Sequence, residues 1–321
     1  MSVLVCFHDR CFDGLGSAAV FTRFYRQCVN PQGEFRYHGL VHRAGQLFDE
    51  GLFDGQENVI VDFKYSASDR LTWWFDHHQS AFLSKADEAH FRQDHSGKKF
   101  YDPDYRSCTN FIVDICRQTF GFAAPELDEL VHWADLIDGA QYPDTQTAVE
   151  LREPATQLTL VIEGTNDPQL SVRLIPELIA KPLGEIMKIP EVRQTFDQLY
   201  ARHLKTIDII RSRGQLDRGV VFFDVTDQNF EGFNKFIPYH LFPGAVYSVS
   251  LSRSPVRIKI GVGSNPWNPT PKNANLASIC ERYGGGGHAK VAAISLPPAE
   301  FARAHEIAAE ITAELRSGLE P

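Results

Sequence analysis

Acidic and imidazole side chains stand at the ends of three short apolar runs in the first eighty residues. Runs of this length, rich in β-branched and aromatic residues, are typical of buried β-strands. A carboxylate supplies charge and a neutral imidazole supplies a directional lone pair, which together suit a divalent metal ion. The runs cover residues 3–7, 59–63 and 71–75, and the polar residues that end them are His8, Asp62, Asp76, His77 and His78.

The order of these runs predicts a parallel α/β sheet. They lack strict alternation, which favours strands that are covered on both faces. In open parallel sheets, ligands bind beyond the carboxyl ends of the strands. We therefore expect His8, Asp13, Asp62 and His77 to converge in one crevice, although any single aspartate in such a position could instead cap a turn.

The segment after the first run is a polar turn that opens a helix. It contains His8, Cys11, Asp13 and Gly14. The unpaired N–H groups of a first helical turn can bind an anion. No Gly-Lys-Ser/Thr follows and the dinucleotide pattern GxGxxG is missing, so neither a P-loop nor a dinucleotide fingerprint is indicated. A capped strand–helix turn explains the glycine alone, but it does not explain the three metal-ligand residue types beside it.

Two acids lie near the end of a helix expected over residues 126–139. These are Asp135 and Asp138. Carboxylates at a helix C-terminus oppose the helix macrodipole, at a cost of about 0.3–1 kcal/mol each. A bound cation would offset that cost, and the alternative is a pair of solvated acids at a frayed end.

The rest of the chain contains a polar segment, a helical segment and a second module. Residues 84–106 are polar and rich in turn formers, which predicts a loop, and residues 154–214 are almost wholly helical in pattern. A compact α+β module is expected afterwards, ending in a helix over 300–316. Within it, a glycine run sits between a helix and a strand, where backbone N–H groups could approach a phosphate. The residues of that run and beside it are Gly284, Gly285, Gly286, Gly287, His288 and Lys290.

Composition and charge limit the possible partners. The chain has 321 residues, 43% of them apolar, and a formal net charge of −9. Proteins that coat long nucleic acids are usually basic, so a polyanion would have to be short and held at a localised site. No apolar stretch reaches the length of a membrane span. The six cysteines form no CxxC pair, which favours a reducing cytoplasm over a disulfide framework.

Together the motifs resemble the DHH phosphoesterase superfamily over nearly the whole chain. The resemblance rests on motifs in the family's order, namely His8-x-x-Cys11-x-Asp13-Gly14, Asp62, Asp76-His77-His78, Asp135 and Gly285-Gly286-Gly287-His288-x-x-x-Ala292-Ala293. The first motif is similar to the branch of bacterial oligoribonucleases that also act on cyclic nucleotides. Many relatives carry aspartate where Cys11 stands. The resemblance implies a DHH catalytic domain over 1–190, a connecting helix over 191–215 and a DHH-associated substrate-binding domain over 216–321.

The resemblance also implies the chemistry of the site. Two divalent ions, usually manganese, would be bridged by Asp62, with His8 and Cys11 on one ion. Asp13, His77 and Asp135 would hold the other, Asp76 would orient a ligating histidine, and His78 would contact the phosphate. A hydroxide between the ions would attack phosphorus in line, so no serine or cysteine nucleophile is needed. His288 and the glycine backbone would bind a terminal phosphate or the nucleotide, and Lys290 beside them is a further candidate from the sequence itself.

The expected function is hydrolysis of short oligonucleotides to nucleoside monophosphates by a monomer or homodimer. The alternatives are a phosphomonoesterase for 3′,5′-bisphosphate nucleotides, an exopolyphosphatase or pyrophosphatase, and a non-catalytic nucleotide sensor. Asn265 and Trp267 could stack a base, although a packed loop tryptophan explains them equally well.

Overall fold

The computed structural model describes residues 1–42, 47–49, 51–165, 167, 169–228, 232–268 and 274–319. Its contacts divide the chain into two compact units. The first consists of Met1–Gln141 and Arg152–Leu199, and the second of Tyr142–Leu151 and Tyr200–Pro321. None of the described helices combines the length and the apolarity that crossing a membrane requires.

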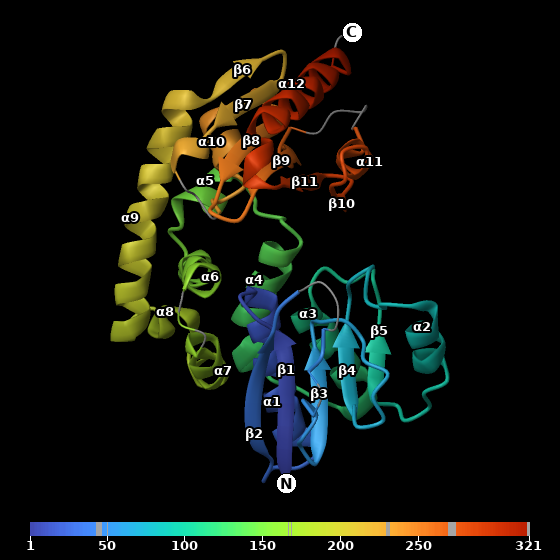
Figure 1. Ribbon diagram of the computed structural model, residues 1–321. Coiled ribbons are helices and arrows are strands. Elements are labelled where there is room, and N and C mark those ends of the chain that lie inside the picture. Colours follow the sequence, from blue (N-terminus) through green and yellow to red (C-terminus); the bar gives the residue numbers. More distant parts are fainter. Residues whose placement is uncertain are drawn as a thin grey trace. The chain divides into compact units, whose positions relative to one another are not determined.

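The first unit contains a five-stranded sheet in which every neighbouring pair is parallel (Figure 1). This confirms the predicted parallel α/β class. The strand order is β2-β1-β3-β4-β5, so the chain leaves β1 in one direction for β2 and lies on the other side from β3 onward. A ligand crevice is expected where the order reverses, beyond the carboxyl ends of β1 and β3. The strands are β1 (Ser2–His8), β2 (Glu34–Leu40), β3 (Glu57–Val61), β4 (Trp73–Asp76) and β5 (Lys99–Tyr101).

Helix α1 lies at the centre of the helical layer on one face of this sheet, and α2 contributes Phe91 to the cluster on the other face. Helix α1 packs on β1 and contacts α3, α4, α6 and α7, so almost all of its side chains are buried. The helices of this unit are α1 (Phe12–Cys28), α2 (Lys85–Arg92), α3 (Cys108–Phe120), α4 (Asp128–Asp138), α6 (Pro154–Gly164), α7 (Leu170–Ala180) and α8 (Leu183–Ile186), with a 3-10 turn η1 (Pro125–Leu127). Helix α9 (Pro190–Arg213) covers the range in which a connecting helix was expected.

The segment 84–106 differs from its prediction as a loop. It contains α2, which Ser84 caps by accepting a hydrogen bond from the N–H of Asp87, and the edge strand β5. No residue of α2 is buried, and β5 spans only three residues. Neither element therefore carries enough apolar periodicity to stand out from a polar loop. Strand β2 was missed for a similar reason, since its residues are mostly exposed or half-buried.

The two tryptophans of β4 anchor the sheet on its two faces. Trp73 packs against Phe21 and Phe24 of α1, whereas Trp74 lies in a cluster with Tyr65 and Phe91 on the opposite face. Consecutive side chains of a strand point to opposite faces, so the pair fixes β4 from both sides. The strand that ends at Asp76 is thus held rigidly.

Replacing Trp74 by alanine is expected to destabilise the protein by about 3–5 kcal/mol. The side chain is fully buried, and its Nε1 donates a hydrogen bond to Phe63 O at 2.9 Å. Urea unfolding followed by circular dichroism measures the change. The matched control is Leu83→Ala, because Leu83 is 53% exposed and should cost less than about 0.5 kcal/mol. Equal destabilisation by both variants would contradict the packing described here.

The second unit is an α+β module, as the sequence predicted. Its six-stranded sheet has the order β10-β11-β9-β8-β7-β6, and only the pair β7–β8 is parallel. Its core lies between this sheet and helices α11 and α12. The strands are β6 (Gln215–Asp217), β7 (Val220–Asp224), β8 (Tyr247–Arg253), β9 (Ile258–Ser264), β10 (Gly286–His288) and β11 (Val291–Leu296). The helices are α5 (Thr145–Glu150), α10 (Ile237–Leu241), α11 (Leu276–Glu281) and α12 (Phe301–Ser317), with 3-10 turns η2 (Thr226–Gln228) and η3 (Pro298–Glu300).

Candidate metal centre

The carboxylate of Asp13 is fixed by the N-terminus of helix α3. Its Oδ2 accepts a hydrogen bond from Cys108 N at 2.7 Å, and its Oδ1 accepts one from Thr109 N at 2.9 Å. These N–H groups have no intrahelical partner, and the helix dipole favours an anion there. Ser107 caps the same helix, so a short segment of sequence positions this buried acid.

His77 presents one ring nitrogen to three carboxylates. Its Nδ1 donates to Tyr105 O at 2.9 Å, because a carbonyl oxygen can only accept, and the neutral ring therefore carries its lone pair on Nε2. This Nε2 lies 3.4 Å from Asp62 Oδ1, 3.7 Å from Asp13 Oδ2 and 3.5 Å from Asp138 Oδ2. One imidazole lone pair surrounded by carboxylates is the donor set of a divalent metal ion.

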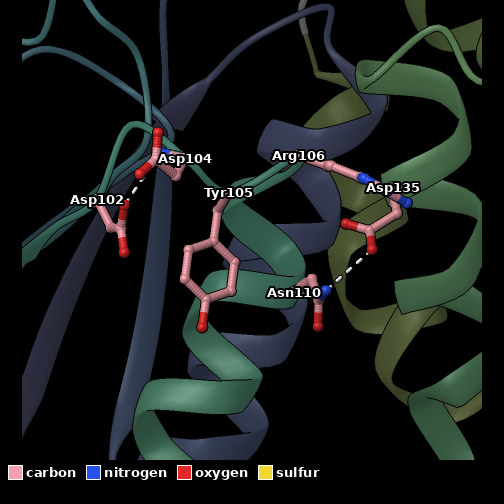
Figure 2. A pocket seen from close by; sticks show the side chains of 6 residues that line it. All are labelled: Asp102, Asp104, Tyr105, Arg106, Asn110 and Asp135. Carbon is pink, nitrogen blue, oxygen red and sulfur yellow. Dashed lines mark hydrogen bonds between the residues drawn. The ribbon is translucent and has the colours of Figure 1, made fainter.

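The expected ligand Asp135 and its neighbour Asp138 lie in different surroundings at the site. Asp138, not Asp135, groups with Asp13 and His77. The carboxylate of Asp135 instead accepts a hydrogen bond from Ser107 Oγ at 2.6 Å. It accepts a second one from Asn110 Nδ2 at 2.9 Å, which Figure 2 shows. The sequence had indicated both acids at the end of the helix, but it could not show which of them reaches the crevice.

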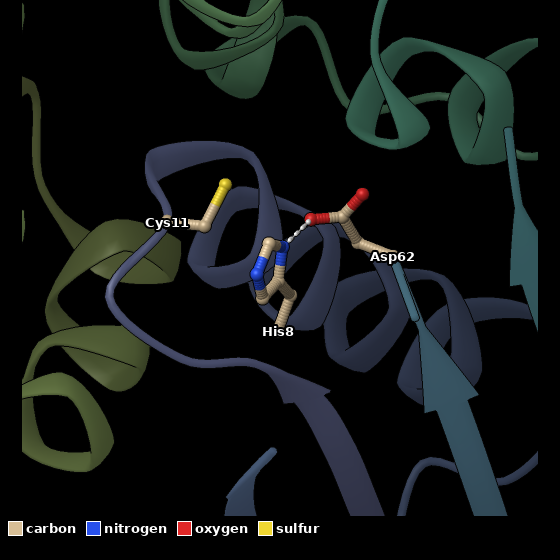
Figure 3. A group of neighbouring side chains, drawn as sticks. All are labelled: His8, Cys11 and Asp62. Atoms are coloured by element: carbon tan, nitrogen blue, oxygen red, sulfur yellow. Dashed lines mark hydrogen bonds and ion pairs between the residues drawn. The ribbon is translucent and has the colours of Figure 1, made fainter. Parts of the chain in front are cut away.

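His8, Cys11 and Asp62 form a second group of ligand atoms that lie within 4.8 Å of one another. His8 ends β1 and Asp62 directly follows β3, and His8 Nδ1 lies 3.2 Å from Asp62 Oδ2. Figure 3 shows Cys11 and Asp62 on either side of the His8 imidazole. Asp62 has a φ of 56°, in the left-handed region, where a non-glycine residue costs about 1 kcal/mol or more. Strain at a site residue is consistent with a functional constraint.

Asp76 and His78 form a pair beside these groups. Asp76 Oδ1 accepts hydrogen bonds from His77 N at 2.9 Å, from His78 N at 3.3 Å and from His78 Nδ1 at 2.7 Å. Asp76 therefore orients the imidazole of His78, whereas His77 is oriented by a backbone carbonyl. Because Nδ1 of His78 donates to Asp76, its Nε2 is the atom left to contact a ligand.

The carboxylates and imidazoles of the site shift one another's pKa values. Burial and the charges of Asp62 and Asp138 raise the pKa of Asp13 well above its ordinary value, and burial together with Asp62 raises the pKa of Asp138 to about 6. Burial works against charge on His77, but Asp62 and Asp13 outweigh it and raise its pKa to about 10. Burial would also raise the pKa of Asp62, yet His77 and His8 hold it well below its ordinary value.

Two observations show that these residues fit metal ions. Within the described part of the chain, Asp62 Oδ1 and His77 Nε2 are buried and have no hydrogen-bond partner. Such orphaned polar atoms are rare and call for an explanation such as an unseen ion. The separations of 3.2–3.7 Å between donor atoms are close to the roughly 3.0–3.4 Å expected for two ligands of one ion with bonds of about 2.1 Å.

The Cys11 thiol is the soft member of the set. Burial raises its pKa well above the ordinary value, and the carboxylates of Asp62, Asp138 and Asp13 raise it further. The side chain makes no capping hydrogen bond although Cys11 is the N-cap residue of α1. It is therefore a neutral thiol unless a cation stabilises the thiolate.

One residue beside the site was not anticipated. The imidazole of His42 stacks on Phe63 at a centroid distance of 4.6 Å and meets the His8 ring edge-on at 5.0 Å. His42 follows β2, a strand that the sequence did not reveal, so no pattern pointed to this position. Burial and the neighbouring His8 and His78 lower the pKa of His42, which favours the neutral ring.

Substituting Gly14 by alanine is expected to disturb this site and to destabilise the protein by about 2 kcal/mol or more. A Cβ at Gly14 would lie 2.0 Å from His8 O, and a backbone atom cannot move aside as a flexible side chain can. Calorimetry should also show weaker manganese binding. Gly184→Ala is the matched control, because only Pro154 Cγ, at 3.9 Å, would be near its Cβ. Unchanged stability and metal binding in Gly14→Ala would be the contrary result.

In the second unit, packing accounts for two glycines of the run. A Cβ at Gly285 would lie 2.4 Å from Ala293 O, and Gly287 has a φ of 143° and faces Val291 O at 2.5 Å. Only Gly286 of the predicted trio faces open space, while His288 and Lys290 are exposed at the β10–β11 hairpin.

The loop tryptophan of the second unit is packed. Trp267 Nε1 donates to Tyr142 O at 2.9 Å, and its ring meets Phe236 edge-on at 5.4 Å. Asn265 is buried and donates through Nδ2 to Ala245 O at 2.7 Å. These contacts agree with the alternative that Trp267 and Asn265 pack within the loop and do not stack a base.

Comparison with known proteins places the fold. No protein-family model and no curated protein matches the sequence. Among solved structures, the chain is similar to a pGpG-specific phosphodiesterase, PggH, from Vibrio cholerae, with a TM-score of 0.69 and 19% identity over 98% of this chain and 99% of that one.

Two further structures extend the likeness. A DHH domain from a protein described as a member of a family of ribosomal proteins has a TM-score of 0.55 and 13% identity, over 96% of this chain and 86% of that one. RecJ from Thermus thermophilus, in complex with Mn²⁺, has a TM-score of 0.51 and 11% identity, over 98% of this chain and 52% of that one. The chain therefore has the fold of the DHH-family phosphoesterases, as its motifs predicted.

Proposed function

We propose that this protein is a metal-dependent phosphodiesterase that hydrolyses short oligonucleotides to nucleoside monophosphates. The observation that carries the proposal is the cluster around Asp62 and His77. A third group of possible ligands consists of Asp62, His77 and His78. Asp62 and His77 each belong to two of the three groups, so the groups join into one continuous site. The fold it shares with a pGpG-specific phosphodiesterase supports a substrate with a short nucleotide chain.

Two divalent ions, manganese being the preferred identity, would be held by this site. His8, Cys11 and Asp62 would bind one ion, and Asp13, His77 and Asp138 would bind the other, with Asp62 between them. RecJ, which shares the fold, was solved with manganese. Carboxylate and imidazole donors suit manganese, and one thiol among them does not exclude it.

When bound, the ions would acidify a water molecule and stabilise the negative charge that develops on the phosphate oxygens. The protein's own residues would position the rest. The N-terminus of α3 holds Asp13 through two backbone N–H groups, and Tyr105 O holds His77. Asp76 directs the imidazole of His78 so that its Nε2 can contact an oxygen of the phosphate.

The β10–β11 hairpin of the second unit is proposed to bind a further phosphate of the substrate. His288 and Lys290 are exposed there, and Gly286 leaves its backbone open to approach. The protein's charge of −9 agrees with local recognition of a short chain, since broad neutralisation of long nucleic acid needs a basic surface.

The product released from a labelled dinucleotide tests the proposal. With added manganese, the protein should yield two nucleoside monophosphates and no inorganic phosphate, and a chelator should stop the reaction. Release of inorganic phosphate from a 3′,5′-bisphosphate nucleotide without diester cleavage would identify a monoesterase instead. Retained nucleotide binding with no turnover of any phosphoester would identify a sensor, and either outcome would overturn the proposal.

A further inference from the structure

A cavity of about 300 Å³ opens in the first unit (Figure 2). This volume is at the lower end of the range for small-molecule sites. The loop after β5 and the first turn of α3 form one wall, and α4 contributes the other. The lining residues are Asp102, Asp104, Tyr105, Arg106, Asn110 and Asp135.

The cavity shares its walls with the candidate metal centre. Tyr105, which lines the cavity, accepts the hydrogen bond of His77 through its backbone oxygen. Ser107, next in sequence to the lining residue Arg106, caps the helix whose N–H groups hold Asp13. A molecule with its phosphate at the metal centre would therefore have this cavity beside it.

Hydrogen-bond acceptors dominate the polar part of the wall. Three of the six lining residues are aspartates, and Arg106 is the single cation among those six. A second phosphate or a polyphosphate chain would be repelled by such a wall. Ribose hydroxyls and the N–H groups of a nucleobase are donors that carboxylates can accept from.

An aromatic ring supplies the other part of the wall. Tyr105 lies between the Asp102–Asp104 pair and Asn110 in Figure 2. Its ring packs on Phe111 at a centroid distance of 4.8 Å, and its hydroxyl donates to Asp114 Oδ2 at 3.4 Å. The bond to Asp114 and the contact with Phe111 thus hold the Tyr105 ring in place. Because the side chain is only half-buried, part of its aromatic surface is left for stacking.

We propose that this cavity binds the nucleoside of the substrate. The base would stack on Tyr105, and the hydroxyl or N–H groups of the nucleoside would donate hydrogen bonds to the carboxylates of Asp102 and Asp104. The inference rests on the proposed function and narrows it, because it selects nucleoside phosphates over pyrophosphate and polyphosphate. None of the residues that would stack or accept from the nucleoside belongs to the candidate ligand groups.

Calorimetric titration with 5′-AMP in the presence of manganese tests the cavity. Tyr105→Leu should raise the dissociation constant about 10-fold or more, since a stacked base contributes that much. Tyr105→Phe keeps the ring and should remain within about 2-fold of the wild type. Asp128→Asn, an exposed acid at the opposite end of α4, is the matched control and should bind as the wild type does.

Two further measurements distinguish a loss of nucleoside binding from a general loss of structure. The manganese-induced rise in Tm should persist in Tyr105→Leu, because the bond from His77 goes to a backbone oxygen. The ratio of kcat/KM for a dinucleotide to kcat/KM for bis(p-nitrophenyl) phosphate should fall about 10-fold in the same variant. A purely structural role would lower both values together.

The outcomes distinguish this inference from the proposed function. If Tyr105→Leu binds 5′-AMP as tightly as the wild type, the nucleoside cavity is wrong even if dinucleotides are hydrolysed. If the wild type hydrolyses no dinucleotide but loses 5′-AMP affinity in Tyr105→Leu, the cavity stands and the proposed reaction does not.

Discussion

Replacing Asp62 by asparagine is expected to reduce manganese-dependent hydrolysis of a dinucleotide by about 1000-fold or more. Metal centres contribute several kcal/mol to such reactions, and each 1.4 kcal/mol corresponds to about a factor of ten. Asp62 lies 3.2 Å from His8 Nδ1 and 3.4 Å from His77 Nε2, so it joins the two groups of ligands. Asparagine keeps the size of the side chain and tolerates the left-handed backbone, which confines the change to the lost charge.

The same substitution should remove most of the thermal stabilisation by manganese. A ligand at 100 times its dissociation constant stabilises the wild type by about 2.7 kcal/mol. Asp69→Asn is the control, since Asp69 is an exposed acid of the same unit outside every candidate ligand group, and it should behave as the wild type. Full activity in Asp62→Asn would remove the central residue of the proposed mechanism.

Asp138→Asn is expected to lower dinucleotide hydrolysis by about 100-fold and to weaken manganese binding. The physical reason is that Asp138 Oδ2 lies 3.5 Å from the Nε2 of His77, within reach of a shared ion. Without metal, the same variant should melt at an equal or higher temperature than the wild type. It removes a carboxylate whose pKa is raised by burial and by the charge of Asp62, so an unfavourable charge is lost from the folded state.

Asp135→Asn is the matched variant, one helical turn away. Its carboxylate bonds to Ser107 and Asn110, so it should keep the manganese-induced rise in Tm. Thermal unfolding of both variants, with manganese and with a chelator, makes the comparison. Loss of the manganese effect in Asp135→Asn and its retention in Asp138→Asn would restore the ligand set that the sequence alone predicted.

The sequence revealed the parallel sheet and the corners of the site because both follow from local pattern. Apolar runs that end in Asp62 or His77 mark buried strands. A polar residue directly after such a strand lies at the carboxyl end of the strand, where the ligand crevice of a parallel sheet is expected. The same reasoning predicted that His8, Asp13, Asp62 and His77 converge, and the structure places them together.

The sequence pattern could not predict site residues whose position depends on tertiary contacts. Asp135 and Asp138 are separated by one turn of α4, and the packing of that helix decides which of them faces His77. His42 follows an exposed edge strand with no apolar run, so nothing local distinguishes it from a surface histidine.

Diffraction at the manganese absorption edge tests the central claim most directly. Crystals grown with manganese should show two anomalous peaks, one contacted by His8 and Asp62 and the other by Asp62, His77 and Asp138. The separations already present between these donor atoms leave room for ions with little rearrangement. An absence of anomalous density beside Asp62, or a peak held by Asp135, would contradict the metal centre described here.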